Sequence, residues 1–414
     1  MNEETKKKAG SGKGLWTLRY TLLNATYFAA FCTVHAYAAV YLLANGFSNT
    51  EVGILLAAAN IVSAVCQPYI AGVIDKPGAL TNRRFILLSV LVILAGSGVL
   101  LFAHSVKLLI FIVFGLIYMI QFAYQPVMTA LCFEYQKAGC DIFYGLARGL
   151  GSASFAVTSA FIGSAVEKNG VTILLYVTML MMALSAVVIF FFRMPGGETE
   201  NASDPASGKK EEGDKGAAQP HNRLSDFART YPAFTLFLVA TICFYFAHNM
   251  INDFMIQIIR SLGGGETELG YANFLQAILE LPVMALITLV FRKISAQKLL
   301  VISGVAFFVK ILILVFAKSM VGMFVSQSFQ LFAYAVFIPA AAYYVSQTME
   351  QLDQVKGQAF VTSAITVGGV FSNLISGVIL DHLGIRFMLV TGSLVCGIGV
   401  VIGWVAMTKL PHHR

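Results

Sequence analysis

Four ionisable residues of this 414-residue sequence stand inside or at the edge of apolar stretches. They are Arg148 in "FYGLARGLGSASF", Asp253 in "HNMINDFMIQ", Glu280 in "AILELPVMALI" and Lys310 in "FFVKILILVF". A charged side chain near a bilayer centre costs roughly 2.5–3.5 kcal/mol on insertion scales, so such residues usually bind substrates or ions. Burial and a nearby cation act oppositely on the pKa of a carboxyl group, which lets it exchange a proton near neutral pH. Glu280, Lys310 and Asp253 are therefore predicted proton-handling residues; a fixed Glu280–Lys310 pair that only holds helices together is the alternative.

Uncharged polar residues follow helical spacing in several apolar stretches. The stretch around Asp253 is the most polar, because Asn249, Asp253, Gln257 and Arg260 recur at three- to four-residue steps and so share one helix face. A single amide on a helix can serve only to join helices, whereas polar and aromatic stripes on six helices favour a shared aqueous cavity. We predict that this cavity binds a ligand through Arg148, Phe155, Gln121, Gln125, His35, His248, Asn249, Asp253 and Gln330.

The composition places the chain in a membrane. Hydrophobic residues make up 57% of it and charged residues only 12%, about half the charged share of a soluble protein. Six cysteines lack metal-type spacing, and no common hydrolase or zinc-enzyme motif is present, so we expect no metal, no cofactor and no enzymatic activity. Lysines before the first apolar stretch are not followed by a cleavage pattern, so no signal peptide is predicted.

Twelve apolar runs are long enough to cross a bilayer as helices. They lie near 18–44, 51–74, 84–104, 106–136, 143–166, 171–192, 231–260, 267–291, 297–317, 320–348, 357–380 and 386–408. The sequence therefore predicts an all-α membrane protein with a six-helix bundle at 1–192, a disordered linker at 193–230 and a second six-helix bundle at 231–414. Most Lys and Arg residues lie on the side of both termini and the linker, which predicts that this side is cytoplasmic. The net charge of +7 follows this topology and does not indicate nucleic-acid binding.

The two halves share a short motif. "FIGSAVEKNGV" (161–171) ends the fifth run, and "ISGVILDHLGI" (375–385) ends the eleventh. Both contain Gly, three residues, an acid, two residues, Gly and then a β-branched residue. Their equivalent positions predict a parallel duplication of a six-helix unit.

The loop after the second run carries a basic motif. "QPYIAGVIDKPGALTNRR" (67–84) resembles the loop motif of the major facilitator superfamily, with Asp75 followed by Gly78 and the basic pair Arg83 and Arg84. Ala71 stands where the family usually has Gly, and the arginines come about two residues late. A carboxylate at a helix end can pair with loop arginines, so we predict that Asp75, Arg83 and Arg84 form a conformational latch.

"FYGLARGLGSASF" resembles the fifth helix of the lactose permease-like oligosaccharide:proton symporters. The resemblance assigns sugar hydroxyls to Arg148 and ring stacking to Phe155, where that group has Trp. It also places Lys310 where lactose permease has an arginine used in proton coupling. Gln330 and Ala333 replace the His and Glu of the tenth-helix permease motif, which argues against a galactoside.

The resemblance implies the major facilitator fold and a proton-coupled symporter that works by alternating access. Its expected substrate is a small polar solute that contains a ring, such as a sugar, oligosaccharide or nucleoside. A proton-driven exporter of aromatic or drug-like compounds on the same fold is the alternative. We expect a monomeric, multi-pass protein of the cytoplasmic cell membrane, with substrate, protons and lipid as its only partners.

Overall fold

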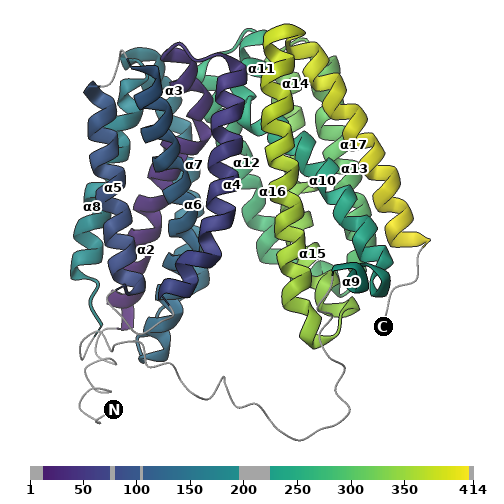
Figure 1. The fold of residues 1–414 in the computed structure, drawn as a ribbon, viewed down its shortest axis with the longest axis horizontal. Coiled ribbons are helices and arrows are strands. Elements are labelled where there is room, and N and C mark those ends of the chain that lie inside the picture. The colour runs from purple at the N-terminus through teal and green to yellow at the C-terminus, as the bar shows by residue number, and fades with distance from the viewer. Residues whose placement is uncertain (1–12, 75–79, 103–105, 195–223, 410–414) are drawn as a thin grey trace, which may run out of the picture. The chain divides into compact units, whose positions relative to one another are not determined.

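The computed structural model describes residues 13–74, 80–102, 106–194 and 224–409. Every regular element in these ranges is a helix (Figure 1). Helices satisfy their backbone groups internally, as lipid requires. The first half contains α2 (Lys13–Phe31), η1 (Cys32–Ala36), α3 (Ala38–Ala44), α4 (Asn49–Ile74), α5 (Asn82–Phe102), α6 (Lys107–Lys137), α7 (Tyr144–Asn169) and α8 (Thr172–Phe191). The second contains α9 (Leu224–Thr230), α10 (Pro232–Asp253), α11 (Met255–Ser261), α12 (Glu266–Phe291), α13 (Ala296–Phe316), α14 (Met320–Ser328), η3 (Phe329–Leu331), α15 (Tyr334–Thr348), α16 (Gln351–His382) and α17 (Gly384–Thr408).

The described helices confirm an all-helical membrane protein. By length and composition, ten of them can cross a membrane, or eleven if the bent pair Gly14–Ala36 and Ala38–Ala44 is one span. Helix α12 covers the predicted eighth span with 26 residues but is not among these ten. The count of twelve and the cytoplasmic position of the termini remain predictions.

The chain divides into two compact units. One contains residues 1–47 and 58–209, and the other contains residues 48–57 and 210–414. Residues 49–57, at the beginning of α4, belong to the second unit, and the rest of α4 belongs to the first. The helix α4 is thus shared between the two units.

The same packing pattern occurs in each unit. In the first unit, α2 packs against α7 and α8, and α5 packs against α6 and α8. In the second, α10 packs against α16 and α17, and α13 packs against α15 and α17. These pairs correspond helix for helix, as expected for a duplicated six-helix unit. The shared sequence motif falls at the same place in each unit, where Gly170 and Gly384 both adopt a positive φ, 78° and 80°.

The first helix of each unit breaks at an equivalent residue. Tyr37 ends η1 with φ −111° and ψ 14°, and Phe254 ends α10 with φ −113° and ψ 26°. A short helix follows each break and ends before a glycine with positive φ, Gly46 at 80° and Gly263 at 83°. Gly46 lies as far beyond Tyr37 in the chain as Gly263 lies beyond Phe254. This sets a common register for the two broken helices.

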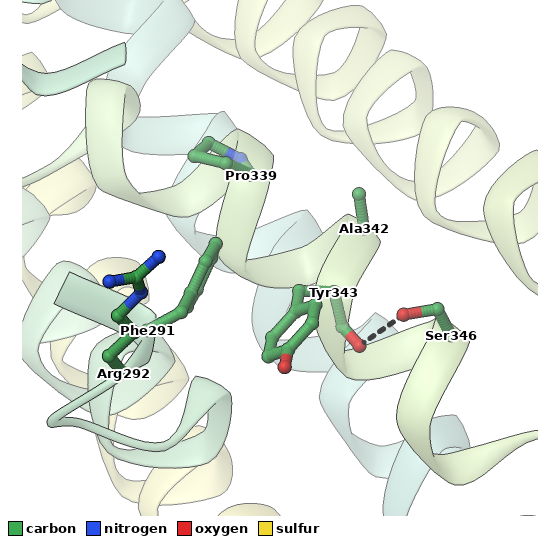
Figure 2. A pocket seen from close by; sticks show the side chains of 6 residues that line it. All are labelled: Phe291, Arg292, Pro339, Ala342, Tyr343 and Ser346. Carbon is green, nitrogen blue, oxygen red and sulfur yellow. Dashed lines mark hydrogen bonds between the residues drawn. The ribbon is translucent and has the colours of Figure 1, made fainter. Parts of the chain in front are cut away.

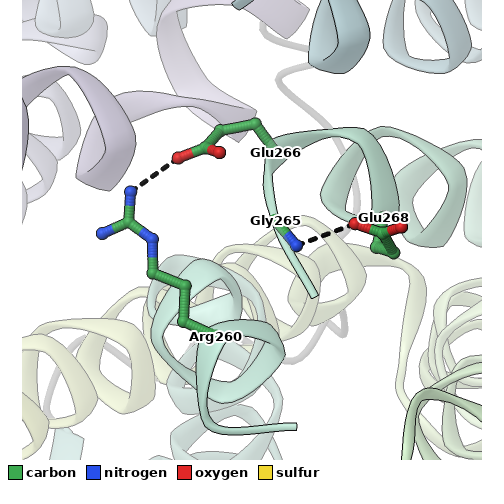
Figure 3. Close-up of polar contacts among 4 residues, drawn as sticks. All are labelled: Arg260, Gly265, Glu266 and Glu268. Carbon is green, nitrogen blue, oxygen red and sulfur yellow. Dashed lines mark hydrogen bonds and ion pairs between the residues drawn. The ribbon is translucent and has the colours of Figure 1, made fainter. Parts of the chain in front are cut away.

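The helices that follow these glycines also begin alike. The backbone N–H of Ser48 donates to Glu51 Oε2 (2.7 Å) before α4, and that of Gly265 donates to Glu268 Oε2 (2.7 Å) before α12. A carboxylate at the third helical position caps the helix in this way. Figure 3 shows the second of these bonds beside the ion pair of Arg260 with Glu266, in which the N and O atoms are 2.6 Å apart.

Helix α16 holds the beginning of α4. The carboxylate of Asp381 accepts hydrogen bonds from the backbone N–H groups of Asn49 (3.1 Å) and Thr50 (2.7 Å) and from the Asn49 amide (2.8 Å). A negative charge is favourable at a helix N-terminus, where backbone donors have no helical acceptor. Nearby, a Cβ built on Gly377 would collide with the carbonyl oxygen of Asn49, so this crossing requires glycine.

The end of the predicted linker is helical. Residues 195–223 lie outside the described part of the chain, but Leu224–Thr230 forms α9, where disorder was predicted. The reason is an aromatic anchor. Phe227 is buried, and its ring centroid lies 5.0 Å from that of Tyr231 and 5.0 Å from that of Phe360 in α16.

Candidate functional site

A buried polar network lies in the second unit. Lys310 of α13 is fully buried, and its ammonium donates to the side-chain oxygen of Gln330 at 2.7 Å and to that of Gln276 at 3.4 Å. The amide nitrogen of Gln330 in turn donates to Glu280 Oε1 at 2.9 Å. Gln330 therefore links the cation to the carboxylate. The predicted association of Glu280 with Lys310 thus includes an amide between them.

The Gln330 side chain has a defined orientation in this network. Its carbonyl oxygen faces an ammonium, which can only donate, and its NH2 group faces a carboxylate, which accepts. Reversal of the amide would lose both interactions. The backbone around Lys310 is also engaged, because the Ser326 hydroxyl donates to the Lys310 carbonyl at 2.7 Å. Helices α12 and α13 and the short η3 segment thus hold the network together.

His248 lies on α10 within the same unit. Its ring stacks on Tyr334 with a centroid distance of 5.3 Å and an interplanar angle of 15°. Its Nε2 lies 2.9 Å from Asn252 Nδ2, so the amide donates whenever this ring nitrogen carries no proton. The predicted site residues Asn249 and Asp253 share the helix but are both partly exposed. Asn249 lies against α16, where a Cβ on Gly369 would come 2.8 Å from its amide nitrogen.

In the first unit, a cluster of aromatic side chains surrounds His35. The His35 ring centroid lies 3.8 Å from that of Phe31, 3.8 Å from that of Tyr118 and 4.5 Å from that of Phe122. Phe155 lies farther out, 6.5 Å from Phe31. We call Phe31, His35, Tyr118 and Phe122 the aromatic cluster.

Arg148 lies on α7 and is half-buried. Its guanidinium carbon lies 4.2 Å from the ring centroid of Phe28, a cation–π contact, and Nη1 donates to Ser152 Oγ at 2.8 Å. Close approach of α2 and α7 makes this possible. A Cβ on Gly151 would lie 2.8 Å from the Phe28 ring and 3.1 Å from Asn24 Cβ. A flat guanidinium can stack on a ring and still present several N–H donors at its edge.

Residues 15–390 match the model of the MFS_1-like family, which is part of the major facilitator superfamily. The chain belongs to the MFS_1-like family. No curated protein matches it in sequence. In fold, this MFS_1-like protein is similar to the nucleoside transporter NupG, with a TM-score of 0.74 and 16% identity over 96% of this chain and 100% of that one. It is also similar to an auto-inhibited POT family peptide transporter, with a TM-score of 0.72 and 10% identity over 96% and 99% of the two chains.

The predicted latch is described only in part. Asp75 of the MFS_1-like protein lies outside the described residues. Arg83 reaches the end of α8, where its Nε donates to the carbonyl of Ile189 (3.1 Å) and Nη2 to that of Phe190 (3.2 Å). Cations favour a helix C-terminus, so this contact stabilises α8. The backbone N–H of Arg84 donates to the hydroxyl of Thr81 (3.2 Å) at the start of α5. The latch remains a prediction.

A surface cavity of about 620 Å³ lies in the second unit (Figure 2). It is lined by Phe291, Arg292, Pro339, Ala342, Tyr343 and Ser346, and Figure 2 shows the rings of Phe291 and Tyr343 facing each other beneath Pro339. None of these is a predicted site residue of the MFS_1-like protein, and none belongs to the buried network. The buried polar groups are therefore stronger candidates for the site than this cavity.

The sequence prediction missed three residues, one in the buried polar network and two in the aromatic cluster. Gln276 contacts Lys310, and Tyr118 and Phe122 contact His35. Helical spacing was the available signal. Tyr118 and Phe122 precede the predicted residues Gln121 and Gln125 by three residues each, and Gln276 precedes Glu280 by four, so each shares a face with a predicted residue. Gln125 itself is partly exposed.

Proposed function

We propose that this chain is a proton-coupled secondary transporter that imports a small polar solute with a ring, of the sugar or nucleoside type, by alternating access. The buried Lys310–Gln330–Glu280 network carries this proposal, because a charged network inside an apolar unit needs a functional reason. The likeness in fold to a nucleoside transporter supports the substrate type. The proposal includes a monomer in the cytoplasmic membrane, with both termini on the cytoplasmic side.

The network suggests how a proton would act. With Glu280 ionised, the bond from Gln330 is assisted by charge and is therefore strong. Protonation of Glu280 weakens this bond and frees the Gln330 amide to turn. Lys310 then loses its 2.7 Å acceptor and keeps only the longer of the two contacts, the one to Gln276 at 3.4 Å. Protonation of Glu280 on α12 thereby changes the hydrogen bonding of Lys310 on α13. This change can favour a different packing of α12 and α13.

Uptake into proteoliposomes tests the function. The purified protein should accumulate labelled nucleosides or sugars when the outside is made acidic, and an added protonophore should abolish the accumulation. Glu280→Gln should stop accumulation but keep exchange between equal concentrations, because the amide retains shape and hydrogen bonding without carrying a proton. Accumulation driven by a sodium gradient, or undiminished in Glu280→Gln, would overturn the coupling assignment. Substrate extrusion against the proton gradient would identify the exporter instead.

Arg148→Lys should reduce substrate binding by about 100-fold or more and leave the melting temperature nearly unchanged. Lysine keeps the charge but lacks the flat fork that stacks on Phe28 and donates two parallel hydrogen bonds to a ligand. Binding of the labelled substrate to protein in detergent measures the effect. Affinity equal to that of the wild type would make Arg148 a structural residue.

A further inference from the structure

Polar atoms within and beside the aromatic cluster lack hydrogen bonds. Both ring nitrogens of His35 and both amide atoms of Gln121 are buried without a partner in the described structure. Gln121 is 0% exposed, and its amide lies close enough to interact with the His35 ring, although not in hydrogen-bond geometry. Buried polar groups in proteins nearly always have partners, so an unpaired group calls for a missing ligand or water. Here four such atoms occur side by side.

The His35 ring fills a slot between two aromatic faces. Phe31 is nearly parallel to the His35 ring (13°) and Tyr118 is tilted from it by 37°, each with its centroid 3.8 Å from that of His35. At this distance each face of an imidazole has room for only one ring. Phe31 and Tyr118 must therefore lie on opposite sides of His35, while Phe122 closes the edge at 75°. One planar ring fills the slot, whose Tyr118 side is inclined to that ring by 37°.

The backbone that carries His35 can change its register. Cys32–Ala36 forms a π-helical turn in the middle of an otherwise α-helical segment, and Tyr37 breaks the helix directly afterwards. A π-turn holds one residue more than an α-turn, and such turns occur frequently at functional sites. If the turn reverts to α-helical bonding, the residues within it rotate by about 100° per residue of register, which takes His35 out of the slot.

We propose that the His35 ring occupies the place of the substrate's heterocycle: a nucleobase-like ring enters between Phe31 and Tyr118 and pairs with Gln121 when His35 leaves. This inference rests on the proposed function and specifies its substrate as a nucleoside that is recognised by its base.

The chemistry of the slot favours a base over a sugar. The amide of Gln121 presents a donor and an acceptor side by side, and so does the edge of a nucleobase. A base is flat and stacks on aromatic rings, whereas a pyranose or furanose is puckered and too thick for a slot with two faces. The ribose would remain outside the slot, where Arg148 and Ser152 offer polar groups on α7.

Two variants in the slot should shift binding in opposite directions. Gln121→Leu removes the pairing amide, so it should weaken the binding of uridine or adenosine by about tenfold or more. His35→Ala empties the slot in advance, so it should tighten the binding of the same nucleosides by roughly fivefold or more, because no displacement is needed. Methyl β-D-ribofuranoside, which has no base, should bind equally to both variants and to the wild type. Calorimetry on purified protein in detergent measures all three, and melting curves confirm that each variant is folded.

Each outcome separates the inference from the function on which it rests. If the wild type binds neither nucleoside but binds a sugar, the nucleoside assignment fails and the transporter proposal survives. If the wild type binds nucleosides but both variants weaken their binding equally, His35 is a structural core residue and the inference is wrong. Loss of methyl riboside binding in either folded variant would also overturn it, because the slot would then hold the sugar.

Discussion

Glu280→Gln should melt at a lower temperature than the double variant Glu280→Gln/Lys310→Met, although the double variant carries one more substitution. Removal of one partner from a buried charge network leaves the other charge uncompensated, at a cost of roughly 3–5 kcal/mol. Lys310 is 0% exposed, so its ammonium depends on acceptors within the protein. The side-chain oxygens of Gln330 and Gln276 remain as acceptors, so we expect a loss near the lower end of this range.

Uptake and melting together decide what the network does. The double variant should melt within a few degrees of the wild type but fail to accumulate substrate against its gradient. A double variant that still accumulates substrate would show that the network only joins helices. Additive losses of stability from Glu280→Gln and Lys310→Met would show that the two side chains do not interact, directly or through Gln330. The single variant Gln330→Leu provides a further check, because it should remove the link between Glu280 and Lys310 without removing either charge.

Gly368→Ala should destabilise the protein by about 1–3 kcal/mol and abolish transport, whereas Gly98→Ala in α5 should be neutral or stabilising. A Cβ on Gly368 would lie 2.7 Å from the carbonyl oxygen of Ile242 and 3.1 Å from the backbone nitrogen of Phe246, neither of which can move without α10. A Cβ on Gly98 would meet nothing within 4 Å.

The effect on transport follows from what α10 carries. Displacement of α10 by an added methyl group would move Tyr245 and His248, which pack against Tyr334 and Phe307 beside the buried network. Replacement of glycine by alanine within a helix otherwise gains close to 1 kcal/mol from backbone entropy, so the control should not lose stability. Equal melting temperatures for the two variants would show that α10 and α16 are not in tight contact at Gly368.

The sequence predicted the elements better than the contacts between them. Apolar length identified the helices, and a shared short motif identified the repeat. Glu280 and Lys310 were identified because they are charges within apolar stretches, and each of these signals is a local pattern. It did not predict that Gln330 lies between those two charges, since this depends on how η3 packs against α12 and α13. The π-helical turn at His35 was equally invisible, because one extra residue per turn leaves no mark in composition.

Local composition was also misleading in one place. The segment 193–230 is polar enough to predict disorder throughout, yet Phe227 anchors α9 at its end through contacts with residues far along the chain. The packing partners of Phe227 include Phe360 in α16, more than 100 residues away, and a single sequence does not reveal that contact.

The common register of the two broken helices has a consequence for how the protein can change. Counting back equally from Gly46 and Gly263, His35 corresponds to Asn252 and Phe31 corresponds to His248. One ancestral helix has thus diverged into two specialised copies, with a stack of rings around its break in the first unit and a histidine beside a charged network in the second. Under the proposed function, recognition resides on α2 and coupling lies beside α10, so selection can alter one without disturbing the other. On that proposal, new substrate ranges are accessible by few substitutions, and none of them needs to touch Glu280 or Lys310.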